Sequence, residues 1–179
     1  MKPLKEFTIQ FVGLKDGEHY FDYQIDKKFF EYFRFEDFND SNINVKVLLN
    51  KKPTLLEFDF KISGTVNVNC DLTNEPYDQE VIGSLDLVVK FGHEFNDDNE
   101  DILIIPHGEF EIKIEQYIYE LIVLSVPKKL IHPGIKDGSL KSDILTKLEE
   151  LSPKTLSEKE NSEGTDPRWD KLKQLLTDK

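Results

Sequence analysis

The sequence predicts an α+β fold in which an antiparallel β-meander or partly closed barrel packs with two or three helices. Apolar and polar residues alternate through the segments 42–50, 54–62 and 79–92, which is the period of half-buried strands. After residue 110 the apolar residues change to helical spacing. Thirteen Phe and six Tyr in 179 residues indicate an aromatic core, and a chain of this length can bury one.

The first part of the chain predicts a hairpin followed by a short helix. Residues 7–12 and 18–25 have the composition of strands and flank turn-forming residues at 13–17, so a hairpin over 7–25 is expected. Asp26 precedes the segment "KKFFEYF". Its carboxylate can accept hydrogen bonds from the backbone N–H groups of a first helical turn, so a short helix is expected directly after it.

Two further strands, 42–50 and 54–62, are expected to be joined by a turn at 51–53. The second strand alternates apolar with polar residues, so its apolar side chains face one way. Gly64 is expected to break or bulge this strand, because glycine has no side chain to pack. Residues 65–70 then continue the same alternation.

The segment after the strands predicts an acidic loop and two helices. Residues 93–102 carry a run of acids and are expected to form a loop. Helical spacing predicts a helix from about 111 to 126 that Pro127 stops, although the β-branched residues leave its first turn open to a strand. A second amphipathic helix is expected over 139–151.

The C-terminal tail predicts a linker and a separate helix. Residues 152–164 are polar and have no periodic apolar face, so a flexible linker is expected after a single α+β domain over 1–151. An amphipathic helix is expected at 165–179. Asp166 is a good N-cap for it, and Pro167 suits its first helical position.

Trp169 and Leu172 share the apolar stripe of this helix. Trp169 has two interpretations. In one, the terminal helix packs back on its own domain and buries the indole. In the other, Trp169 and Arg168 anchor a partner protein, since both residue types are enriched at interface hot spots. The linker ahead of the helix favours the partner, because amphipathic helices dock into grooves of other proteins.

The net charge of the chain is strongly negative. Acidic residues outnumber basic ones 35 to 23, which gives a formal charge of −12. A protein that binds nucleic acid by neutralising phosphates carries a basic surface instead. The charge therefore disfavours RNA or DNA as the main partner and favours a basic protein.

Composition also bounds the location of the protein. The single cysteine rules out an internal disulfide framework and is compatible with a reducing compartment. No apolar run approaches the roughly 20 residues that cross a bilayer. The N-terminus lacks the apolar stretch of a secretory signal. A cytoplasmic monomer with no membrane association is expected.

No motif for catalysis, metal binding or cofactor binding is present. The chain has neither the nucleophile motif GxSxG nor the phosphate-binding loops GxxxxGK[ST] and GxGxxG. One Cys and four scattered His do not supply the ligand spacing of a zinc site. The acidic run 97–101 lacks the alternating ligands and central glycine of a calcium loop. We expect no enzyme activity, catalytic residue, metal or cofactor.

The segment "GTVNVNCDLTNEPY" (64–77) runs from a strand into Cys70 and Asp71, with Pro76 shortly after. It resembles the bacterial and plastid YceD family, which has a strand that ends in Gly-x-Val-x-x-x-Cys, followed by Asp and, shortly after, by Pro. Cys70, Asp71 and Pro76 match that pattern.

The tail and two other segments extend the resemblance. The closing Asp-Pro-Arg and Leu-rich helix of the family correspond to Asp166, Pro167 and Arg168. Residues 117–127 look like the family's helix that ends in Leu-x-Leu-Pro. The N-terminal segment is similar to the form of Bacteroidetes-like members. The resemblance covers nearly the whole chain.

The chain departs from the family at its cysteines. Leu72 and Thr73 stand where the family often has Arg and a second Cys. Many members also place a cysteine cluster after the Leu-Pro, which suggests a metal knuckle, whereas residues 128–145 contain no cysteine. A zinc-dependent activity of the family therefore does not transfer to this chain.

The resemblance implies a non-enzymatic factor that supports accumulation of large-subunit ribosomal RNA and ribosome assembly. The acidic chain suits a basic ribosomal protein of the large subunit or a pre-ribosomal particle as partner, and direct RNA contact stays open. A small zinc-ribbon protein of that subunit is a natural candidate, because its gene often neighbours the family's gene. The alternative is a small-molecule-binding β-rich module with a cavity between strands and helix. The candidate partner-binding residues are Asp166, Pro167, Arg168, Trp169, Leu172, Cys70, Asp71 and Pro76.

We expect the C-terminal helix to matter for binding more than for folding. Removal of residues 165–179 is expected to leave the melting transition of the sheet domain in place, because the polar linker separates the two apolar clusters. Trp169→Ala is expected to weaken binding of ribosomal components by roughly 2 kcal/mol or more, since it removes the largest apolar group of the stripe. Thermal melting and binding assays test both points. A truncation that abolishes the melting transition would show that the helix is part of the fold.

Overall fold

The computed structural model of the chain describes residues 5–99, 102–140 and 143–151. The chain divides into two units, Met1–Lys141 and Ser142–Lys179. The described part of the second unit is the helix α4 (Asp143–Leu151), and every other described element belongs to the first unit. The linker and the terminal helix expected within 152–179 lie outside the described residues.

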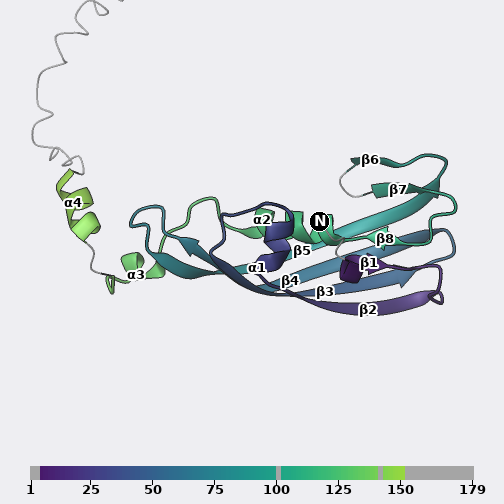
Figure 1. Cartoon of the computed structure of the whole chain (residues 1–179), viewed down its shortest axis with the longest axis horizontal. Coiled ribbons are helices and arrows are strands. Elements are labelled where there is room, and N and C mark those ends of the chain that lie inside the picture. Colours follow the sequence, from purple (N-terminus) through teal and green to yellow (C-terminus); the bar gives the residue numbers. More distant parts are fainter. Residues whose placement is uncertain (1–4, 100–101, 141–142, 152–179) are drawn as a thin grey trace, which may run out of the picture. The chain divides into compact units, whose positions relative to one another are not determined.

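Six strands of the first unit form one open, mixed sheet (Figure 1). In spatial order they are β2 (Gly17–Ile25), β3 (Asp40–Lys51), β4 (Leu55–Asn69), β5 (Pro76–Gly92), β7 (Ile102–Pro106) and β6 (Asn96–Asn99). All neighbours run antiparallel except β5 and β7, which are parallel. The α+β class is confirmed, and so is a meander through β2, β3, β4 and β5.

The partly closed barrel is wrong. Among the described strands, β2 and β6 are the two edges of the sheet and do not pair with each other. All four residues of β6 are exposed, and two of them are Asp. Charged residues on an edge strand oppose further strand pairing, so the sheet ends at β6.

One face of the sheet supplies most of the core. Side chains of the three longest strands alternate between buried and exposed positions, as the sequence period predicts. The inward residues of β4, in its first half, are Leu56, Phe58, Phe60 and Ile62, and each is at most 2% exposed. The turn between β3 and β4 and the continued alternation through 65–70 are confirmed.

The short helix α1 (Lys27–Tyr32) begins where the sequence predicts. Asp26 is its N-cap, and Oδ1 of this residue accepts a hydrogen bond from the Lys28 backbone N–H at 3.0 Å. Phe29 and Phe30 are buried, and α1 lies against β3. The capped helix is therefore confirmed.

The helix α2 (Glu115–Ser125) packs against β5 and β4. It begins later than expected, because Ile112–Lys113 form the short strand β8, so the alternative of a strand at the start of this segment is confirmed. Val126 is extended and Pro127 follows it, which ends the helix as predicted. The buried residues of α2 are Ile118, Leu121 and Ile122.

The predicted hairpin over 7–25 is wrong. Strand β1 (Thr8–Ile9) follows the 3-10 turn η1 (Lys5–Phe7) and pairs with β8, where Ile9 lies opposite Ile112. Strand β2 pairs along its whole length with β3 instead. Both Ile9 and Ile112 belong to the core. The partner of β1 is far along the chain, so a local sequence pattern could not indicate it.

Gly64 neither breaks nor bulges β4. The strand is continuous, and its register with β3 and β5 runs through Gly64 without a shift. A Cβ at this position would lie 2.2 Å from the Asn42 carbonyl oxygen and 2.6 Å from the Ile43 Cα. Glycine therefore permits close approach of the β3 backbone.

The acidic segment at 93–102 is more than a loop. Residues Asn96–Asn99 form β6, which pairs antiparallel with β7 through an irregular register. In β7, Leu103 and Ile105 are buried, and the strand adds to β5 in parallel. The apolar residues of β7 and the free edge of β5 together order a segment whose acids alone indicated a loop.

The predicted helix at 139–151 is present from Asp143 onward as α4. A short helix, α3 (Pro133–Lys136), precedes it and was not predicted. The N-cap of α3 is His132, whose Nδ1 accepts a hydrogen bond from the Gly134 N–H at 2.9 Å. None of the helices in the described ranges combines the length and apolar character that crossing a membrane requires.

Gly64→Ala is expected to destabilise the protein by about 2 kcal/mol, because the added methyl group meets backbone atoms that cannot rotate away. Ser63→Ala is the matched control, since Ser63 is the exposed neighbour on the same strand. Urea denaturation of both variants gives the free energies of unfolding. A Gly64→Ala variant as stable as Ser63→Ala would contradict the close approach.

Candidate functional site

The predicted site residues Cys70, Asp71 and Pro76 lie together at the turn between β4 and β5. Backbone hydrogen bonds close this turn. The Cys70 N–H donates to the Glu75 carbonyl at 2.9 Å, and the Asn74 N–H donates to the Cys70 carbonyl at 2.8 Å. Asn74 has a φ of 58°, a left-handed conformation that Asn adopts more readily than most residues.

The turn holds the segment that follows α2. The Asp71 backbone N–H donates to the Leu130 carbonyl at 2.8 Å, and the Leu130 N–H donates to Oδ2 of Asp71 at 2.7 Å. The His132 N–H donates to Sγ of Cys70 at 3.3 Å. We name Cys70, Asp71, Leu130 and His132 the turn clamp. These contacts give Cys70 and Asp71 a role within the fold itself.

The chemistry of Cys70 is that of a buried hydrogen-bond acceptor. Burial raises the pKa of its thiol, but hydrogen bonds from His132, Thr73 and Leu72 outweigh burial and bring the pKa below its usual value. Cys70 is the only cysteine of the chain. The described residues contain no group of three or more His, Cys, Asp or Glu that could hold a metal ion.

The other predicted partner-binding residues lie outside the described residues. They are Asp166, Pro167, Arg168, Trp169 and Leu172. Their roles stay predictions. The turn clamp bonds to the chain itself, and contact of its residues with a partner also stays a prediction.

The sheet face opposite the core is polar. Side-chain hydrogen bonds cross the strands from Gln24 to Asn42 at 2.7 Å and from Asn67 to Asp78 at 2.7 Å. Tyr20 is exposed on the β2 edge of the sheet. These hydrogen bonds link β2 to β3 and β4 to β5 on this face.

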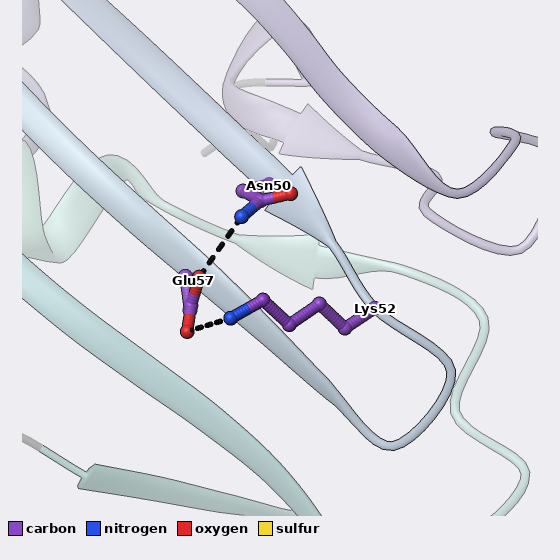
Figure 2. A network of polar contacts seen from close by, with 3 residues as sticks. All are labelled: Asn50, Lys52 and Glu57. Carbon is purple, nitrogen blue, oxygen red and sulfur yellow. Dashed lines mark hydrogen bonds and ion pairs between the residues drawn. The ribbon is translucent and has the colours of Figure 1, made fainter.

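Glu57 fixes the end of the β3–β4 hairpin (Figure 2). Its carboxylate accepts hydrogen bonds from Nδ2 of Asn50 at 3.0 Å and from Nζ of Lys52. The hydrogen bond from Lys52 is the main cause that holds the pKa of Glu57 below its usual value. Because the pKa is lowered on folding, the stabilisation is present near neutral pH and is lost as the pH falls through that pKa. This network supports the turn.

A groove of about 1160 Å³ lies where β5, β6, β7, β8 and α2 come together. Its floor is apolar. The floor residues Leu87, Leu103, Ile105, Ile112 and Leu121 are each at most 8% exposed. At its edges, Phe95 and Leu124 are 59% and 83% exposed. The groove therefore offers apolar surface both at its base and at its rim.

The rim of this groove is acidic. Among the described residues that line it, the carboxylates are Asp97, Glu109, Glu111, Glu115 and Glu120, and the one cationic side chain is Lys113. We name the feature the acidic groove. The negative charge of the groove acts on the hydroxyl of Tyr117. Burial raises the pKa of Tyr117, and the Asp97 and Glu120 carboxylates raise it further.

One carboxylate of the acidic groove is incompletely satisfied. Oε2 of Glu115 is buried and has no hydrogen-bond partner among the described residues. Glu115 is the first residue of α2, where a negative charge interacts favourably with the helix dipole. The dipole stabilises the charge but leaves this oxygen free to accept a hydrogen bond.

Sequence reasoning missed the acidic groove, because the described residues that line it lie in or beside six elements, α1, β5, β6, β7, β8 and α2, that are separated along the chain. A partial signal was available. Four of the five rim acids fall between residues 109 and 120, interleaved with apolar residues. That segment indicated only a helix, since the strands that complete the groove could not be placed beside it from sequence.

The fold and these features define an α+β protein with an open sheet and an acidic, apolar-floored groove. The family described as Large ribosomal RNA subunit accumulation protein YceD matches residues 58–176, more than half of the 179 residues. The chain belongs to the YceD family, which confirms the resemblance. The match begins within β4 and includes the turn clamp and α2. Comparison with curated proteins and with solved structures gives no match.

Asp71→Ala is expected to destabilise the protein by about 1 kcal/mol, because it leaves the Leu130 N–H without its carboxylate acceptor. Asp71→Asn is the control, since its side chain keeps an oxygen that can accept the same hydrogen bond. Urea denaturation midpoints compare the two variants. Equal stabilities would show that this hydrogen bond contributes nothing measurable to the fold.

Proposed function

We propose that this protein is a non-enzymatic factor that supports large-subunit ribosomal RNA accumulation by binding a basic ribosomal protein or a pre-ribosomal particle. Membership of the YceD family supports a role in this process, since the description of the family names accumulation of the large ribosomal RNA subunit. The formal charge of −12 supports a basic protein as the partner, because opposite charges attract.

The acidic groove is the observation that carries the choice of a basic partner. At physiological ionic strength the Debye length is about 8 Å, so carboxylates near the contact matter more than distant charges. Within the part of the chain that the structure describes, five carboxylates and one lysine line this groove. Such a surface attracts Lys and Arg side chains and repels the phosphates of RNA.

The chemistry of the groove also favours binding over catalysis. Carboxylates placed around an apolar floor are suited to hold a cationic group by charge and an apolar group by burial. Neither interaction changes a covalent bond. A binding role therefore needs no residue beyond those that the groove already presents.

The small-molecule-binding alternative is supported by one observation. The acidic groove lies between strands and α2, where that function requires a cavity. Its volume of about 1160 Å³ lies near the upper end of the ~300–1,000 Å³ of typical ligand pockets, so size does not distinguish a small molecule from a polypeptide segment. In a thermal-shift assay, an increase in melting temperature with metabolites but not with ribosomal components would support the alternative.

The isolated protein is expected to bind bare large-subunit RNA fragments weakly and a basic large-subunit ribosomal protein more tightly, because its charge repels phosphate and attracts cations. Binding of the protein partner is expected to weaken as salt rises, since screening reduces the attraction. Titrations at several salt concentrations measure both affinities. Nanomolar binding of RNA at about 0.15 M salt would favour a direct RNA-binding protein instead.

A further inference from the structure

We infer that the acidic groove binds one cationic amphipathic polypeptide segment, whose apolar side chains enter the floor and whose Lys and Arg side chains lie over the rim. This inference rests on the proposed function, because the basic partner proposed there supplies such a segment. It adds the surface of contact and the pattern of residues that the surface selects.

The floor of the groove selects apolar side chains. Leu103, Ile112 and Leu121 line its base and are almost fully buried, so each presents a small apolar surface to the groove. Phe95 and Leu124 stand at the edges and are largely exposed. Large apolar residues at the edge of an apolar hollow are typical of protein interfaces, where they pack around an inserted anchor.

The rim selects several positive charges in one chain. Its carboxylates come from separate elements: Asp97 from β6, Glu109 and Glu111 from the segment before β8, and Glu120 from α2. Each of these carboxylates can pair with a separate cationic side chain. A segment that carries cations at intervals complements the whole rim. Its positive charge also guides the segment toward the groove before its apolar residues are buried.

The free Oε2 of Glu115 adds a specific contact. A buried acceptor without a partner costs free energy, and a charged donor from a ligand would satisfy it. Hydrogen bonds between carboxylates and Lys or Arg side chains are stronger than bonds between neutral groups. The first residue of α2 is therefore positioned to receive a cationic side chain of the bound segment.

Charge also decides against the other occupants. RNA would bring phosphates against the rim carboxylates, and a second copy of this chain would bring a net charge of −12. A polyamine matches the rim but leaves the apolar floor uncovered. An amphipathic cationic segment is the occupant that complements both parts.

The test uses a fluorescein-labelled synthetic peptide that carries Lys, Arg and Leu at helical spacing. Fluorescence anisotropy measures how tightly this peptide binds to the full chain. Two control peptides change one property each: in one, Glu replaces every Lys and Arg, and in the other, Ser replaces every Leu. We expect both control peptides to bind at least about tenfold more weakly than the amphipathic cationic peptide. Binding of either control peptide as tight as that of the amphipathic cationic peptide would overturn the inference. So would displacement by spermidine of the amphipathic peptide and the Ser control peptide with equal ease, because Leu would then contribute nothing to binding.

Matched variants of the protein locate the contact. The groove variant is Glu111→Gln/Glu115→Gln/Glu120→Gln. Its control is Asp22→Asn/Glu80→Gln/Asp86→Asn, which removes three charges from exposed positions of β2 and β5 that are not among the described residues lining the groove. We expect the groove variant to bind the peptide at least about tenfold more weakly and the control to change affinity by less than about twofold. Equal losses would mean that general charge, and not the groove, binds the peptide.

A second pair of variants tests the apolar contact. Leu124→Ser removes an exposed residue of the groove edge, and Ile82→Ser removes an exposed residue of the polar sheet face. A severalfold loss of affinity is expected only for Leu124→Ser. Equal effects of the two substitutions would overturn the apolar contact. Dimerisation that Leu124→Ser abolishes would assign the groove to a second copy and contradict the inference.

The two proposals fail in different ways. A basic ribosomal protein that binds the groove variant as tightly as the wild type would overturn the inference and leave the proposed function intact. Peptide binding that the groove variant loses, together with no binding of any basic ribosomal protein, would support the chemistry of the groove and contradict the proposed function. Thermal melting of each variant confirms that the fold is kept.

Discussion

The register of β4 between β3 and β5 is the constraint on which the rest of the structure depends. Side chains alternate along a strand, so a slip of one residue would turn Phe58 and Phe60 from the core to solvent. Gly64 allows the β3 backbone to approach closely in the middle of this register. At one end, Glu57 bonds to Asn50 and Lys52 and fixes the hairpin turn.

The other end of β4 connects the sheet to the helical segment. Cys70 and Asp71 follow the strand directly and bond to His132 and Leu130, which lie beyond α2. The same residues carry the family resemblance, and the family match includes them. The turn clamp thus bonds the chain after α2 to the β4–β5 turn, while the helix itself packs on β5.

The position of α2 creates the surface on which the proposed function depends. Its buried residues face β5 and β4, which leaves Glu115, Glu120 and Leu124 beside β7 and β8. The short acidic edge strand β6 adds Asp97 to the same hollow. Asp97 on this edge strand therefore has two effects: its charge opposes further strand pairing, and it adds to the negative charge on which the proposed cationic partner depends.

The sequence by itself determined the elements whose signals are local. Alternation gave the long strands, the carboxylate of Asp26 gave the start of α1, and Cys70, Asp71 and Pro76 indicated the family. The tertiary structure alone decided the pairing of β1 with β8, the parallel addition of β7 to β5, and the acidic groove. Each joins residues that are distant in sequence. Their proximity follows from burial of apolar surface in the whole fold, which no local pattern records.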